Sequence, residues 1–139
     1  MVALSGFGQV DIEVVMAQYD TCIIAAHNFK ATRNDSGVSV YEQAKLAIER
    51  LLDPVLLSKD NRARYARMFA DNLPEICKEI ARHDDRRALD ELAGLGILNA
   101  GNLQDVIDEI STLQDVATTA YLLEMKRRRF GGAAIDFDL

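Results

Sequence analysis

The amino-acid sequence predicts an all-α fold of stacked helical hairpins, an α-solenoid with about seven helices, because apolar residues recur every three or four positions. No segment combines strict apolar–polar alternation with β-branched enrichment, as half-buried strands do. Shifting the chain by thirty positions places apolar residues on apolar ones and acids on acids across residues 73–130. An offset of this size is typical of stacked repeat units.

The N-terminal part is predicted to contain one helix. Residues 1–10 carry Gly6 and Gly8 without a clear period, so we expect a poorly ordered lead-in. Asp11 is expected to cap a helix that ends near residues 27–29. Residues 30–37 have the composition of a loop. The apolar positions of this helix are Val14, Val15, Cys22, Ile23 and Ala26.

Two further helical segments follow. One spans residues 38–52 and ends at Asp53, because the residue before Pro54 is disfavoured in a helix. Ser58 is predicted to cap the next segment. Pro74 then either kinks one helix or separates two; we favour two, at residues 59–71 and 74–83, with Asn72 near the cap. The residues expected to point inward are Tyr41, Ala44, Ala47, Ile48, Leu51, Leu52, Tyr65, Met68 and Phe69.

Three shorter helices complete the chain, at residues 86–93, 103–110 and 116–129. Asp85 and Asp115 are placed to cap the first and the last of them. Gly94 and Gly96 end the first, one of them in the left-handed conformation. Residues 99–102 form a turn, and residues 131–139 form a short acidic tail.

Residues 77–99 resemble an ankyrin repeat. In that motif, a first helix with a leucine and two small residues leads through a short turn to a second helix with paired aliphatic residues and a terminal glycine. Here Cys77 stands at the leucine, Ile80-Ala81 at the small pair, Asp84-Asp85 at the turn, Ala88-Leu89 and Leu92-Ala93 at the aliphatic pairs, and Gly96 at the glycine, with Asn99 after it.

A second copy fits the same frame but departs at its end, where Lys126 replaces the glycine. Neither copy has the Thr-Pro-Leu-His opening of typical ankyrin repeats. The chain is therefore more similar to divergent ankyrin-like helical repeats of bacterial proteins. This resemblance implies a partner-binding rather than a catalytic role, and a terminal capping unit with a polar outer face. The matching positions of the second copy are Ile107, Ile110-Ser111, Gln114-Asp115, Thr118-Thr119 and Leu122-Leu123.

Composition bounds the class of protein. The 139 residues suit a single domain, and 49% apolar with 27% charged residues is ordinary for a globular chain. We find no apolar run long enough to span a bilayer and no positively charged start typical of a signal peptide. Two cysteines within apolar patterns favour buried thiols in a reducing compartment. The expected location is the cytoplasm, without membrane association.

No catalytic residue, metal site or cofactor is predicted. Cys22 with His27, and Cys77 with His83, offer zinc-ligand chemistry, but spacings of five and six residues turn the side chains apart on a helix. The scattered aspartates, Asp20 among them, lack calcium-loop spacing and are interpreted as caps and solvated surface.

Two functions follow from these observations. The leading prediction is a non-catalytic helical-repeat module that binds a protein partner; the partner's identity and homo-oligomerisation stay open. The alternative is a regulatory protein that binds nucleic acid through a basic patch, which a net charge of −6 disfavours. The predicted partner-binding residues are Arg82, His83, Asp84, Gly101, Asn102 and Gln104; the basic patch comprises Arg86, Arg87, Lys126, Arg127, Arg128 and Arg129.

Overall fold

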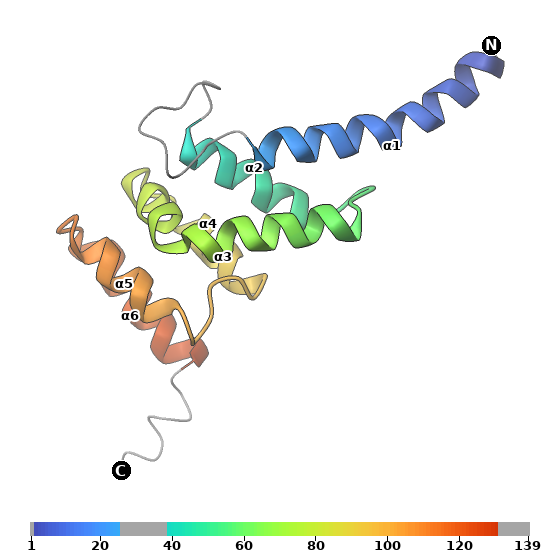
Figure 1. The fold of residues 1–139 in the computed structure, drawn as a ribbon. Helices are drawn as coiled ribbons and strands as arrows, with labels where there is room; N and C mark the ends of the chain where they lie inside the picture. Colours follow the sequence, from blue (N-terminus) through green and yellow to red (C-terminus); the bar gives the residue numbers. More distant parts are fainter. Residues whose placement is uncertain (1, 26–38, 131–139) are drawn as a thin grey trace. The chain divides into compact units, whose positions relative to one another are not determined.

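The computed structural model describes residues 2–25 and 39–130, and all regular structure within them is helical, as predicted (Figure 1). The chain divides into two compact units, unit 1 (Met1–Met68) and unit 2 (Phe69–Leu139). The elements are α1 (Val2–Ile24), α2 (Val40–Leu52), α3 (Lys59–Arg82), α4 (Arg86–Gly94), α5 (Leu103–Ser111), α6 (Val116–Met125) and the π-helical η1 (Lys126–Phe130).

Helix α1 begins at Val2, so the structure places residues 2–10 in a helix where the sequence predicted a lead-in. Asp11 lies inside this helix and does not begin it. No proline interrupts residues 2–24, and a glycine inside a helix costs only about 1 kcal/mol. Gly6 and Gly8 therefore weaken the helix without ending it.

The side of α1 that packs differs from the predicted one. Ile23 is buried as expected, but Val14, Val15 and Cys22 are exposed. Asp20, interpreted from the sequence as a surface residue, is fully buried. Ala26, His27 and the predicted loop at 30–37 lie outside the described residues.

Helix α2 begins with a capping box that the sequence analysis overlooked. The Ser39 hydroxyl accepts from the Glu42 backbone N–H at 3.0 Å, and the Glu42 carboxylate accepts from the Ser39 N–H at 3.1 Å. The spacing Ser-x-x-Glu is the signal for this arrangement. Of the predicted inward residues, Leu52 is exposed and Tyr41 partly buried, whereas the buried ones are Ala44, Ala47, Ile48 and Leu51.

Helix α3 starts where predicted, because the Ser58 hydroxyl accepts from the Asn61 N–H at 3.0 Å. Tyr65, Met68 and Phe69 are buried as expected. The helical assignment runs continuously to Arg82, but Asn72 leaves helical geometry at φ −134° and ψ 20°. Two helical segments therefore meet at a kink at Asn72, just before Pro74, as the sequence analysis favoured.

Unit 2 contains two helical hairpins whose turns match at an offset of thirty residues. Asp84 has φ 56° and Gln114 has φ 58°, both in the left-handed region. The residue after each is an N-cap: Asp85 accepts from the Ala88 N–H at 3.1 Å, and Asp115 from the Thr118 N–H at 3.0 Å. The end of α3 with α4 forms hairpin 1, and α5 with α6 forms hairpin 2.

Between the hairpins, Gly96 adopts φ 81°, the left-handed conformation predicted for one of the two glycines. Asn102 precedes α5, but its side chain bonds the loop, donating to the Ile97 carbonyl at 2.9 Å. After α6, the chain changes to π-helical geometry over Lys126–Phe130, where the end of the predicted helix was expected. The core of unit 2 includes Leu73, Ile76, Cys77, Ile80, Leu89, Leu92, Leu98, Leu103, Val106, Ile110, Leu122 and Met125.

The two cysteines are expected to react very differently. Burial raises the pKa of the Cys77 thiol to about 12, whereas Cys22 is exposed on α1. Because the thiolate is the reactive form, a maleimide should label Cys22 in the native protein and leave Cys77 unmodified. Mass spectrometry of the native and urea-unfolded protein measures this, with Cys22→Ser as the control. Equal labelling of both thiols in the native state would contradict the packing around Cys77.

Candidate functional site

The predicted partner-binding residues lie at two separate places in unit 2. Arg82, His83 and Asp84 form the turn of hairpin 1, whereas Gly101, Asn102 and Gln104 lie at the start of α5. An ion pair between Lys78 Nζ and Glu109 Oε2 at 2.7 Å sets the register of the two first helices. The turn of hairpin 1 therefore lies near the end of α5. At a helical rise of about 1.5 Å per residue, that end is about 13 Å from the start of α5. The structure does not bring the six residues into one patch.

The predicted basic patch is also divided, and its cations have partners. At the start of α4, Arg86 pairs with Asp84, and Arg87 pairs with Glu91 one turn further along the helix. The four cations of η1 contact acids or an amide within unit 2. The pairs are Lys126 with Gln104, Arg127 and Arg128 with Glu124, and Arg129 with Asp90.

Helix α4 contacts α6 and the following η1 through Asp90. Arg129 Nη2 lies 3.4 Å from Asp90 Oδ1. Burial and the Asp90 carboxylate, which hydrogen-bonds the Tyr121 hydroxyl, raise the pKa of Tyr121. The Thr118 N–H and hydroxyl lower the pKa of Asp115, and the charge of Arg86 acts in the same direction. Arg86 and Asp90 thus face hairpin 2.

The residues thirty positions after Arg86 and Asp90 are Val116 and Ala120, and both face solvent. Val116 is 79% exposed, and Leu123, about two helical turns further along α6, is 49% exposed. This is the open face of α6, a shallow and mostly apolar hollow of about 280 Å³. It is lined by Ser111, Gln114, Asp115, Val116, Thr119, Ala120 and Leu123.

The resemblance implied a capping unit with a polar outer face. The open face of α6 carries two exposed large apolar side chains, Val116 and Leu123, beside polar ones. The charges expected to provide the cap follow α6 in η1 and do not cover Val116 or Leu123. A helix that is apolar on opposite sides is usually buried on both. The apolar side chains on the open face of α6 therefore have no covering element among the described residues.

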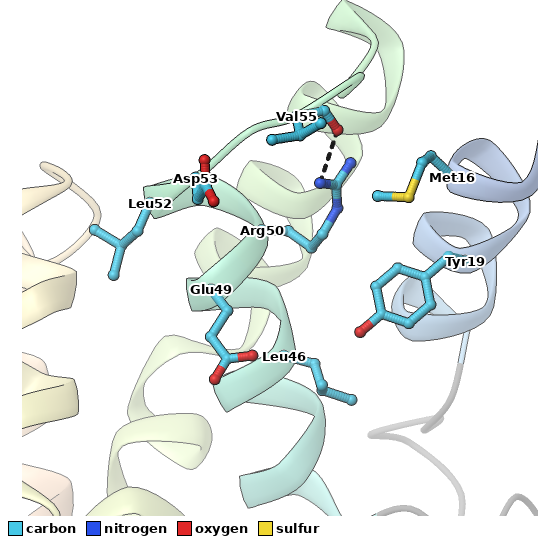
Figure 2. Close-up of a pocket in the computed structure, with 8 residues that line it drawn as sticks. All are labelled: Met16, Tyr19, Leu46, Glu49, Arg50, Leu52, Asp53 and Val55. Carbon is cyan, nitrogen blue, oxygen red and sulfur yellow. Dashed lines mark hydrogen bonds between the residues drawn. The ribbon is translucent and has the colours of Figure 1, made fainter. Parts of the chain in front are cut away.

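Unit 1 has a larger hollow, of about 530 Å³, between α1 and the end of α2 (Figure 2). Its apolar side chains come from both helices and the following loop, and Glu49 and Asp53 add two carboxylates. Arg50 is its only cationic lining residue among those described. The lining comprises Met16, Tyr19, Leu46, Glu49, Arg50, Leu52, Asp53 and Val55.

The Arg50 guanidinium is not available to an anionic ligand. Arg50 donates from Nε to Asp20 Oδ1 at 2.6 Å, from Nη2 to Asp20 Oδ2 at 2.9 Å and from Nη1 to the Val55 carbonyl at 2.9 Å. The Tyr65 hydroxyl donates to Asp20 Oδ1 at 2.7 Å. These three side chains form the Asp20 cluster, which joins α1 to α2 and to the start of α3.

The Asp20 cluster changes the protonation of its members. Burial alone raises the pKa of Asp20, but hydrogen bonds from Arg50 and Tyr65 and the charge of Arg50 lower it overall below its usual value. Burial and the Asp20 carboxylate raise the pKa of Tyr65. Asp20 is therefore a carboxylate and Tyr65 a neutral donor at neutral pH. The cluster holds helices together and leaves no group free for acid–base chemistry.

Within residues 2–25 and 39–130, no three His, Cys, Asp or Glu side chains gather as metal ligands. None of the described helices combines the length and apolar character required to cross a membrane. No family model, curated protein or solved structure matches the chain.

Removing the charge of Asp20 tests the cluster. We expect Asp20→Asn to lower the free energy of unfolding by about 3–5 kcal/mol, because Arg50 is left buried without its counter-charge. Urea denaturation at pH 7 measures this change, and a second substitution, Arg50→Met, should recover part of it. A loss as large in the double variant as the sum of the two single losses would contradict the coupling.

The same cluster predicts a pH dependence. Because folding lowers the pKa of Asp20, its contribution is complete above the pKa of an unfolded aspartate, about 3.9, and disappears as the pH falls through the folded-state value. Denaturation between pH 7 and pH 3 should show a steeper loss of stability in the wild type than in Asp20→Asn. Parallel curves for the two proteins would contradict this assignment.

Proposed function

We propose that this protein is a non-catalytic module that binds a protein partner, and that the two hairpins of unit 2 are copies of one helical repeat. Three features at an offset of thirty residues support the repeat. The left-handed turn residues are Asp84 and Gln114, the N-caps are Asp85 and Asp115, and the inward aliphatic residues Leu92 and Leu122 are fully buried. The proposed repeat rests on the geometry of the two hairpins and agrees with the ankyrin-like resemblance of the sequence.

The open face of α6 is the observation that carries the proposal. In hairpin 1 the corresponding positions, Arg86 and Asp90, are used for contact with the next hairpin. In hairpin 2, Val116 and Ala120 have no such neighbour among the described residues. Repeat units bury their faces by stacking on one another. A helical element of a partner protein would complete this arrangement by packing on α6.

The predicted tip residues extend this surface. The turn of hairpin 2 contributes Ser111 and Gln114 to the open face, and the turn of hairpin 1 at Arg82, His83 and Asp84 occupies the matching place in its own hairpin. We retain these three residues as a predicted part of the contact. Gly101, Asn102 and Gln104 lie toward the other end of α5 and would meet a second part of the partner.

Two further aspects are part of the proposal. The partners of the six patch cations lie within unit 2, which counts against the nucleic-acid alternative, because phosphate binding needs cations that are free to displace counterions. The proposed compartment is the cytoplasm. Cys22 and Cys77 are free thiols, which supports a reducing environment.

A matched pair of substitutions tests the open face. Val116→Glu places a charge on the open face, whereas Ala117→Glu places the same charge at the next, exposed position outside it. Both lie in the first turn of α6, where the helix dipole favours a carboxylate, so the fold should be retained. We expect Val116→Glu to weaken partner binding about tenfold or more, because the partner would bury an unpaired charge.

The measurement is recovery of a stoichiometric partner from a lysate of the source cells, followed by titration of the purified partner. Ala117→Glu should bind as the wild type does. Equal binding by Val116→Glu, or the absence of any stoichiometric partner, would contradict the proposal. Salt-dependent binding of DNA or RNA by the wild type would instead support the basic-patch alternative.

A further inference from the structure

The hollow between α1 and the end of α2 has apolar walls that face solvent. Figure 2 shows the Met16 and Tyr19 side chains extending from α1 toward α2, where Leu46 lies on the opposite side. On the rim, Tyr19, Leu52 and Val55 stay between 43% and 56% exposed. Its volume of about 530 Å³ is within the range of binding sites, which are mostly apolar with a few polar groups that determine what binds.

The two carboxylates of the hollow have no counter-charge among the described residues. Glu49 and Asp53 are exposed and lie four residues apart at the end of α2, a spacing at which like charges repel each other. Neither side chain takes part in an ion pair or a hydrogen bond with a described residue. Arg50 gives its charge to Asp20, and Lys45, one turn before Glu49, does not line the hollow. The charge that the hollow presents is therefore negative.

The end of α2 strengthens this negative charge. The helix ends at Leu52, and the carbonyl groups of its last turn carry a partial negative charge. Carboxylates at this end of a helix are repelled by those carbonyl groups, so the charges of Glu49 and Asp53 do not stabilise α2. A cation bound beside them would be attracted by both carboxylates, by the helix end and by the half-exposed Tyr19 ring, whose face attracts cations.

The lining selects an occupant with a positive head and an apolar stem. A lysine or arginine side chain has this composition, because its alkyl stem packs on apolar surface while its charged group stays hydrated. Sites for small molecules enclose most of the ligand surface, whereas the rim side chains of this hollow stay about half exposed. A basic side chain that a protein backbone holds in place needs no such enclosure, since its neighbours in the partner add further contacts.

We propose that this hollow docks a lysine or arginine side chain of a partner protein. The stem of that side chain lies along Met16, Tyr19 and Leu46, and its charged group lies beside Glu49 and Asp53. An apolar residue next to the basic one in the partner packs on the exposed rim. This contact surface belongs to unit 1 and does not depend on partner binding at the open face of α6.

NMR titration of the full chain with a short synthetic peptide tests this docking. The peptide has blocked ends, a central lysine and a leucine on each side of it. It should shift the resonances of the Met16 methyl group and the Tyr19 ring. We expect it to bind about threefold or more tightly than the same peptide with glutamine in place of lysine, because exposed ion pairs contribute only modestly. Added salt should reduce this difference.

Two double variants locate the site. Glu49→Gln with Asp53→Asn should weaken binding of the lysine peptide about threefold or more and leave binding of the glutamine peptide unchanged. Asp71→Asn with Glu75→Gln is the matched control and should bind as the wild type does, since these acids are exposed at the same spacing on α3 and lie outside the hollow. All four carboxylates are exposed, so both variants should fold, which circular dichroism checks.

Three results would overturn the proposal. They are equal binding of the lysine and glutamine peptides by the wild type, equal loss of binding in the two double variants, and a titration that leaves the lining resonances unshifted. Because the probe is a defined peptide, any of these results counts against the hollow alone and not against the open face of α6.

Discussion

The buried carboxylate of Asp20 is the constraint on which the arrangement of unit 1 depends. A charge without solvent must be paired and hydrogen-bonded, and Arg50 and Tyr65 together supply three hydrogen bonds to it. A long helix with apolar residues on several sides could otherwise pack in more than one rotation. The carboxylate selects one rotation, because only that setting places Asp20 against Arg50. Val14, Val15 and Cys22 are left exposed on α1 as a consequence.

In unit 2, two hairpins with matching turns leave apolar side chains of a helix exposed. The capping aspartates and left-handed turn residues build two similar hairpins, but the outward positions of the second helix differ between them. In α4, Asp90 contacts Tyr121 of α6 and Arg129 of η1. Helix α6 has apolar side chains at the equivalent positions and no described neighbour. Taken separately, each unit has exposed apolar side chains on one of its helices, Val14 and Val15 on α1 and Val116 and Leu123 on α6.

Local chemistry explains which features could be predicted from the sequence. The caps at Ser58, Asp85 and Asp115, a left-handed glycine at one of two positions and the inward residues of α2 other than Tyr41 and Leu52 are determined within a few residues, and these were predicted. The burial of Asp20 depends on Arg50 and Tyr65, thirty and forty-five residues away. Local patterns carry no information on such partners. The exposure of Cys22 and the open face of α6 were missed for the same reason, because both depend on which elements pack nearby.

The central claim is that a protein partner binds to the open face of α6. Site-specific photo-cross-linking from position 116 in the source cells tests it most directly. We expect a photoreactive side chain at position 116 to capture one protein species reproducibly, and the same group at position 117 to capture it far less. No cross-linked protein at position 116, or equal capture from both positions, would contradict the claim.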